Sequence, residues 1–216
     1  MRTAIQHGLL ALSFALIASL SAKTAWPGPL QLAAVVAAVV VASAATVIVS
    51  RLRRRLRMWS HWLLGGVLAL APLGGWVAVR RSFGADPAML AVALVFWVAG
   101  FDIIASCQYA RSDREAGIFT LPARWGAKRA LIVSSGSHVA ACWSLAIFAQ
   151  LCDLGWIFLL GVIAIVPGLH VAHRLVRPED LSRARAAGYP AAIVLGGVLL
   201  AFAAADVYWR ARVWPI

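Results

Sequence analysis

The chain has 216 residues, of which 62% are apolar and 13% charged, and its mean hydropathy is +0.85. Such a chain has too few polar side chains to cover an apolar core in water, which excludes a soluble globular domain. The formal net charge of +12 suggests nucleic acid as a partner, but the basic residues lie between apolar stretches, a pattern that indicates membrane topology and excludes a DNA-binding groove.

Seven apolar stretches are long enough to cross a bilayer, which takes about 20 residues per helix. They cover residues 5–22, 30–50, 59–79, 88–107, 130–151, 154–175 and 189–208. The connections between them are short, and none has the composition of a soluble domain. We therefore predict one all-α transmembrane domain over residues 1–216, built as a polytopic helical bundle of about seven helices.

Proline and glycine residues predict where these helices turn or bend. Turns are expected at Pro27-Gly28-Pro29 and over Ser82–Pro87, between consecutive stretches. Pro72 lies inside the third stretch, where it removes one backbone hydrogen bond and predicts a kink supported by neighbouring helices.

Basic residues alternate from one connection to the next. The second, fourth and sixth connections carry Arg51, Arg53, Arg54, Arg55, Arg57, Arg111, Arg114, Arg124, Lys128, Arg129, Arg174, Arg177, Arg183 and Arg185. The opposite side carries only Lys23, Arg80, Arg81, Arg210 and Arg212. By the positive-inside rule, we predict an integral protein of a bacterial inner membrane with a cytoplasmic N-terminus.

Three of the eight acidic residues lie in the segment 101–117, at the end of the fourth stretch. If that helix continues past Cys107, then Asp102, Tyr109 and Asp113 fall at i, i+7 and i+11, on one helix face. Two carboxylates among arginines are suited to hold Mg²⁺ against a phosphate-bearing ligand. A solvated, salt-bridged charge cluster at a helix end explains the same spacing.

The segment 102–126 resembles the second aspartate-rich motif of the UbiA-type membrane prenyltransferases, and most closely the branch that serves menaquinone and ubiquinone synthesis. The resemblance lies in Asp102-Ile103-Ile104, Gln108, Asp113-Arg114, Gly117 and Leu121-Pro122-Ala123-Arg124-Trp125-Gly126. It extends along the chain, because His7–Leu20 resembles the first helix of that family and Trp59–Gly74 its fifth.

This resemblance implies a reduced UbiA-like fold that transfers a prenyl chain from its diphosphate to an aromatic quinone precursor. It implies Mg²⁺ as cofactor, with Asp102 and Asp113 as its ligands. It implies that the substrate-binding groups are Gln108, Arg114, Glu115 and Arg124. Membrane lipids and a polyprenyl diphosphate or quinone-type ligand are the implied partners, and no nucleic acid is expected.

The chain departs from the family pattern in three ways. Tyr109 stands where the motif has an aspartate, and Ala105 where it has a tyrosine. The first aspartate-rich motif is expected after Ser43–Ser50, but residues 49–57 read VSRLRRRLR, without a carboxylate or an asparagine. Seven spans against the usual nine correspond to loss of the third and fourth helices. The arginine run either binds diphosphate without metal or anchors the chain to anionic lipid.

Two functional hypotheses follow. The chain is a prenyltransferase that acts on a quinone precursor, or it is a catalytically inactive relative that serves as a structural or lipid- or quinone-binding subunit of a larger membrane complex. In the second case a partner protein covers the open side of the bundle. His170 and His173, spaced i and i+3, are further candidates for metal ligation, although no third ligand lies near them in the sequence.

Overall fold

The computed structural model describes the backbone of residues 2–23 and 27–213, with side chains throughout these ranges except at 2–4, 23, 50 and 52–57. The helices are α1 (Arg2–Lys23), α2 (Pro29–Leu56), α3 (Ser60–Leu68), α4 (Leu70–Arg80), α5 (Ala85–Ser106), α6 (Ala110–Glu115), α7 (Leu121–Leu151), α8 (Trp156–Arg174), α9 (Ala184–Ala187) and α10 (Tyr189–Val213). Short 3₁₀ turns, η1 (Arg57–Trp59) and η2 (Cys107–Tyr109), precede α3 and α6. Within these described ranges there is no strand.

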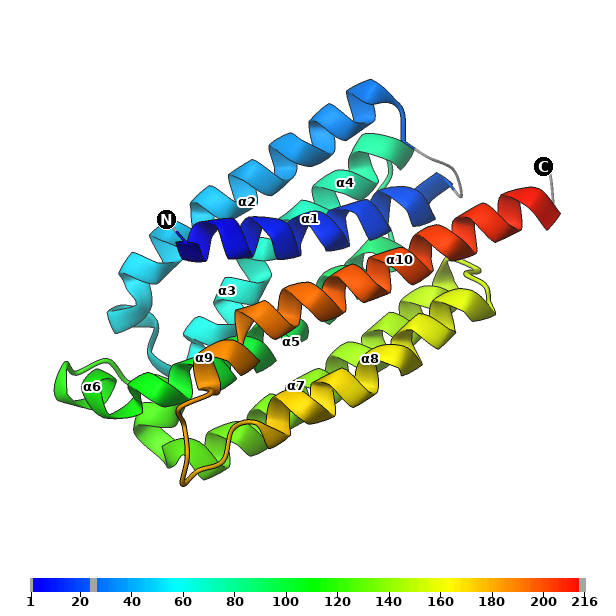
Figure 1. The fold of residues 1–216 in the computed structure, drawn as a ribbon. Helices are drawn as coiled ribbons and strands as arrows, with labels where there is room; N and C mark the ends of the chain where they lie inside the picture. Colours follow the sequence, from blue (N-terminus) through cyan, green and yellow to red (C-terminus); the bar gives the residue numbers. More distant parts are fainter. Residues whose placement is uncertain (1, 24–26, 214–216) are drawn as a thin grey trace.

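Seven membrane-length apolar helical segments confirm the predicted all-α bundle. They lie alongside one another, and the N-terminal end of α1 lies at the same end of the bundle as α6 and α9, while the C-terminal end of α10 lies at the other (Figure 1). The end with α6 and α9 also holds the connections rich in basic residues, and we refer to it as the basic end. That it faces the cytoplasm remains a prediction.

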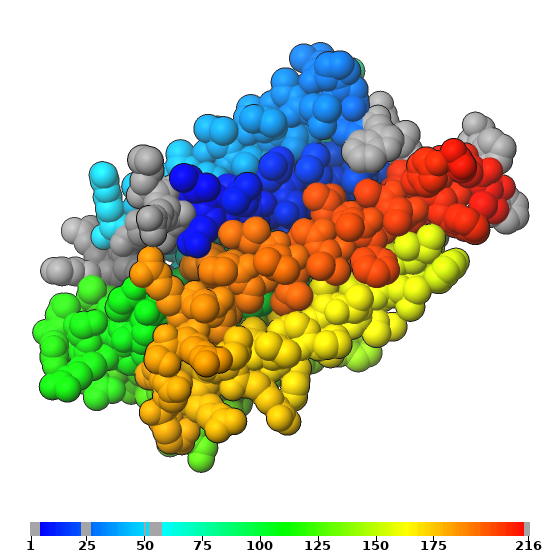
Figure 2. Space-filling view, in the orientation of Figure 1, coloured from blue at the N-terminus to red at the C-terminus, as the bar shows by residue number. Residues whose placement is uncertain are grey.

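The central helix is α5, which packs on α7, α3 and α10 and is buried over most of its length. Its sequence is apolar on all sides, as expected for a helix surrounded by others. In contrast, only 28% of the most apolar stretch of α2 is buried inside the protein, and α2 lies along one edge of the molecule (Figure 2). Its exposed side chains, such as Val36, Val40 and Ile48, form an apolar flank suited to contact with lipid or a partner helix.

The third predicted span is broken in the structure, as Pro72 predicts. Helix α3 ends at Leu68 and α4 begins at Leu70, with Ala69 between them. An unbroken helix would need a hydrogen bond from the amide of residue 72 to the Leu68 carbonyl, and proline has no such donor. The break at Ala69 therefore falls three residues before the proline, directly after the carbonyl that loses its partner.

The fourth predicted span does not continue as one regular helix past Cys107. Helix α5 ends at Ser106, the 3₁₀ turn η2 follows, and α6 lies beyond the end of α5 (Figure 1). Asp102 is 4% exposed, whereas Tyr109 is 49% exposed. The expectation that Asp102, Tyr109 and Asp113 share one face is therefore wrong, because the change of helical pitch at η2 turns the chain outward.

Candidate functional site

A buried hydrogen-bonded cluster surrounds Asp102 near the basic end of the bundle. The Tyr189 hydroxyl on α10 donates to Asp102 Oδ1 at 3.0 Å, and His61 Nδ1 on α3 lies 2.5 Å from Asp102 Oδ2. All three side chains are less than 9% exposed. A carboxylate removed from water needs such donors, because an unpaired buried charge is strongly disfavoured. The cluster thus joins three helices through one acid.

The contact of His61 Nε2 shows which of the two ring nitrogens carries the proton of a neutral imidazole. His61 Nε2 lies 3.4 Å from the backbone nitrogen of Leu121, the first residue of α7. A backbone amide only donates, so Nε2 is the acceptor and the proton of a neutral imidazole is on Nδ1, which donates to Asp102. His61 therefore links α5 to the start of α7, and both oxygens of Asp102 accept hydrogen bonds.

A second histidine extends this polar cluster to α1 and α2. The ring of His7 packs edge-on against Tyr189 with a centroid distance of 4.7 Å, and its Nδ1 lies 3.2 Å from the Thr46 hydroxyl. Both His7 and Thr46 are buried. A continuous series of side-chain contacts thus connects five helices. Its members, in order, are Thr46, His7, Tyr189, Asp102 and His61.

Asp113 contacts the residue before the start of α7, next to the one that His61 contacts. Its Oδ2 accepts a hydrogen bond of 3.0 Å from the Thr120 hydroxyl, and Thr120 is the residue before α7. Asp113 is half-buried, in contrast to the buried Asp102. The two aspartates of the predicted site are therefore linked to consecutive residues. Asp113 contacts Thr120 directly, and Asp102 is linked to Leu121 through His61.

The remaining predicted substrate-binding residues lie around α6 and the start of α7. Gln108 Nε2 donates to the Ala105 carbonyl at 2.9 Å and closes the end of α5, while Arg114 Nε donates to the Ala123 carbonyl at 2.9 Å. Glu115 accepts from Arg111 at 3.0 Å in an exposed pair, which contributes little to stability. Arg124 is exposed. Asp113 and Arg114 are thus both hydrogen-bonded to the segment at the start of α7, and Arg124 follows that segment on the surface.

The donor set bears on the predicted Mg²⁺ site. Among the described residues, no three His, Cys, Asp or Glu side chains form a group suited to one metal ion. Mg²⁺ binds one or two carboxylates together with waters and substrate phosphates, so the half-buried Asp113 is suited to it. Asp102 is buried and each of its oxygens already accepts a hydrogen bond, from His61 and from Tyr189, so metal ligation by Asp102 stays a prediction.

Sequence reasoning missed His61, Tyr189 and His7 as members of the site. Their partners are far away in the chain: His61 precedes Asp102 by 41 residues and Tyr189 follows it by 87. The available signal was that His61 and Asp102 are ionisable residues in apolar stretches, where such groups generally pair with one another. The predicted metal pair His170 and His173 is treated below, because these side chains lie elsewhere.

The fold and this polar cluster define an integral membrane protein of the helical-bundle class. The model of the UbiA prenyltransferase family matches residues 2–193, and the chain belongs to this family. The predicted resemblance is thereby confirmed at the level of the superfamily.

Two known proteins are similar to the chain. A protein of Thermofilum pendens (strain DSM 2475 / Hrk 5) named protoheme IX farnesyltransferase is 27% identical over 139 residues, which are 64% of this chain and 48% of the relative. The chain therefore spans about half the length of this curated relative. The apo structure of a UbiA homologue from Aeropyrum pernix K1 superposes with a TM-score of 0.72 at 19% identity, over 91% of this chain and 98% of that one. This likeness supports the fold.

Proposed function

We propose that the chain is a prenyltransferase that moves a polyprenyl group from its diphosphate to an aromatic quinone precursor. The family match over residues 2–193 supports a reaction of this class. The observation that carries the proposal is the loop before α7, which holds Asp113 and Arg114 together at the basic end. A diphosphate at the membrane surface and a prenyl chain in the apolar bundle suit this arrangement.

Arginines supply the charge that such a leaving group needs. Arg114 uses its Nε–H for the Ala123 carbonyl, and the guanidinium retains further N–H donors for diphosphate oxygens. Arg124, one turn into α7, is exposed and adds a second guanidinium. As the allylic C–O bond breaks, its electron pair leaves with the diphosphate, and fixed cations stabilise that developing charge. The ring then forms a bond to the prenyl carbon and loses a proton.

Magnesium, when bound, would neutralise charge on the diphosphate oxygens. Asp113 is the residue proposed to hold it, with substrate oxygens and water completing the coordination. Asp102, the other predicted ligand, is proposed instead to fix α3, α5 and α10 relative to the start of α7, since its partners come from these elements.

The test is product formation by purified protein in detergent with Mg²⁺. A polyprenyl diphosphate is offered with 4-hydroxybenzoate or a naphthoate, and farnesyl diphosphate with protoheme IX, the acceptor in the name of the relative. We expect prenylated product with a quinone precursor and a loss of about 100-fold or more in Asp113→Asn. Asp86→Asn, at the opposite end of the bundle, is the matched control. Absence of product from every pair would refute the enzymatic function.

A second function, that of a non-catalytic subunit in a membrane complex, is favoured by one observation. Both oxygens of Asp102 are occupied by protein donors, so the motif position that the family resemblance assigns to metal has a structural role here. The exposed flank of α2 would then contact a partner protein.

Site-specific crosslinking separates the two functions. A photoreactive residue replacing Val40, which is 60% exposed on α2, should form a crosslink to another polypeptide in native membranes if the subunit function holds. The same group replacing Val194, 65% exposed on α10, is the control for random lipid-facing collisions. Product formation together with equal labelling at both positions would exclude the subunit function.

A further inference from the structure

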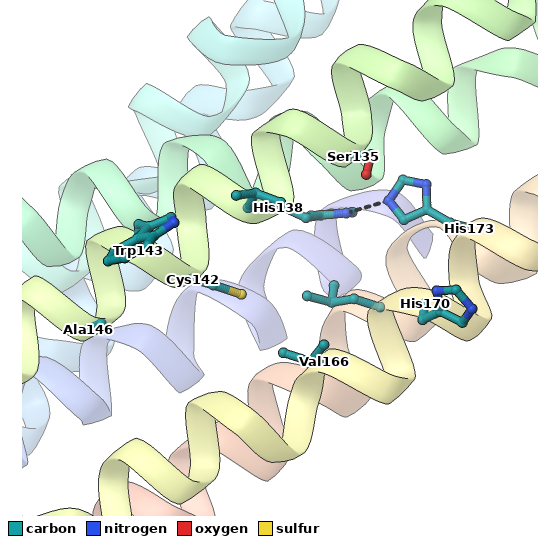
Figure 3. A pocket seen from close by; sticks show the side chains of 10 residues that line it. Ser135, His138, Cys142, Trp143, Ala146, Val166, His170 and His173 are labelled. Atoms are coloured by element: carbon teal, nitrogen blue, oxygen red, sulfur yellow. Dashed lines mark hydrogen bonds between the residues drawn. The ribbon is translucent and has the colours of Figure 1, made fainter.

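A cleft of about 520 Å³ lies between α7 and α8, and its lining includes neither Asp102 and its partners nor residues of the loop before α7. Figure 3 shows its two walls, with the histidines gathered at one end and Trp143 and Ala146 toward the other. The cleft is open on its outer side, where Val139, Trp143 and Val166 are 56%, 68% and 49% exposed. In a bilayer this outer side faces the hydrocarbon region.

The polar end of the cleft is built from three histidines. His138 Nδ1 lies 2.9 Å from His173 Nε2, and His170 lies one turn before His173 on α8 (Figure 3). His138 is 3% exposed and packs where Gly100 leaves room, since a Cβ on that glycine would overlap the imidazole. The buried ring holds His173 by a side-chain hydrogen bond, and His170 remains exposed. No described residue completes a metal site here.

The whole cleft is long enough to hold a lipid chain with its polar end. Its α7 wall extends from Ser135 to Ala146, about 16 Å along a helix axis, and this length includes His138 at the polar end. This length is about half of the roughly 30 Å hydrocarbon thickness of a bilayer, and so matches one leaflet. The histidine end lies toward the C-terminal end of α8, which is the basic end of the bundle.

Positive charge continues beyond the histidines. Arg174 follows His173 directly and lines a second hollow together with Arg177 and Arg183. Asp180, one of the two acids there, accepts a hydrogen bond from the Ser182 amide, and its pKa is lowered by the hydrogen bonds to Ser182. The combination of an apolar groove, a histidine end and neighbouring arginines is complementary to an anionic headgroup on a linear apolar chain.

We propose that the α7–α8 cleft binds an anionic glycerophospholipid, with one acyl chain between Val139 and Val166 and the phosphate at His170, His173 and Arg174. The histidines and Arg174 donate hydrogen bonds to phosphate oxygens. The cleft has histidines at one end only, so one lipid is expected per chain. This site is independent of the prenyl-transfer proposal, since it uses neither Asp113 nor Arg114.

Native mass spectrometry of the full chain in a mild detergent tests the site, with phosphatidylglycerol, phosphatidylethanolamine and phosphatidylcholine added in equal amounts. The wild type should retain one phosphatidylglycerol. Val166→Trp, which fills the groove, should reduce the retained fraction about tenfold. Ile163→Trp, 65% exposed on the same helix but outside the cleft, should not change it. Val139→Trp on the α7 wall provides a second blocking variant should Val166→Trp fold poorly.

The headgroup contact is tested by the triple variant His170→Ala/His173→Ala/Arg174→Ala, which should bind the three lipids without preference. Equal phosphatidylglycerol retention in the tryptophan variants and the wild type would overturn the proposal. So would equal retention of neutral lipids by the wild type, or an isoprenoid quinone in place of the phospholipid.

Discussion

Tyr189→Phe tests the structural role of the Asp102 cluster by removing a single hydroxyl group. The variant keeps the aromatic ring and its edge-on contact with His7, and removes only the hydroxyl that donates to Asp102 Oδ1 at 3.0 Å. A hydrogen bond to a buried charged group contributes about 1.5–3 kcal/mol to stability. At about 2–4 °C per kcal/mol for a chain of this length, a loss of about 2 kcal/mol lowers the melting temperature by about 4–8 °C.

The melting temperature is measured by intrinsic tryptophan fluorescence of purified protein in detergent. Tyr208→Phe is the matched control, because Tyr208 lies on the same helix and is 52% exposed. Exposed substitutions generally change stability by less than about 0.5 kcal/mol. Equal melting temperatures for the two variants would refute the reasoning.

A double-mutant cycle then assigns the loss to Asp102. In an Asp102→Asn background the phenol no longer donates to a charge, so Tyr189→Phe should have a smaller effect there than in the wild type. We expect a coupling free energy of about 1–2 kcal/mol, within the range for residues in one hydrogen-bonded network. If the stability losses of the two substitutions were additive, the Tyr189 hydroxyl would not act through Asp102.

Three further predictions concern the packing and the end of the bundle opposite the basic end. Gly65→Ala places a Cβ 2.5 Å from the Val95 carbonyl oxygen and should lower stability by about 1–3 kcal/mol, whereas Gly66→Ala meets open space and should be neutral in the same thermal assay. Asp206→Ala should lower stability by about 1–3 kcal/mol, because its carboxylate accepts the Gly155 and Phe158 amides at the start of α8. Burial raises the pKa of Cys152 to about 12, so its thiol stays protonated at pH 8 and maleimide labelling, followed by mass spectrometry, should be slow until unfolding.

The sequence allowed the bundle to be predicted but not the partners of its buried polar groups. Apolar length and the missing amide of Pro72 are local properties, and both the seven spans and the break before Pro72 followed from them. The contacts of Asp102 depend on how α3 and α10 pack against α5, and no spacing within 101–117 contains that information. The end of α5 at Ser106 was missed for a related reason. Nothing in the residues 107–109 forbids a continued helix, and the outward turn is set by the tertiary contacts of Asp113 and Arg114 with the segment before and inside α7.

The closed Asp102 cluster also predicts how the protein responds to Mg²⁺ alone. A ligand at 100 times its dissociation constant stabilises a folded protein by about 2.7 kcal/mol, or about 5–10 °C here. Both oxygens of Asp102 accept hydrogen bonds from buried side chains that a cation would have to compete with, and a single carboxylate at Asp113 binds Mg²⁺ weakly without substrate oxygens. Millimolar Mg²⁺ or EDTA should therefore change the melting temperature by less than about 1 °C, and a prenyl diphosphate analogue should be needed for a Mg²⁺-dependent increase that Asp113→Asn removes. If Mg²⁺ alone raised the melting temperature by several degrees and Asp102→Asn abolished this rise, the cluster would bind metal. Its two hydrogen bonds would then not have a purely structural role.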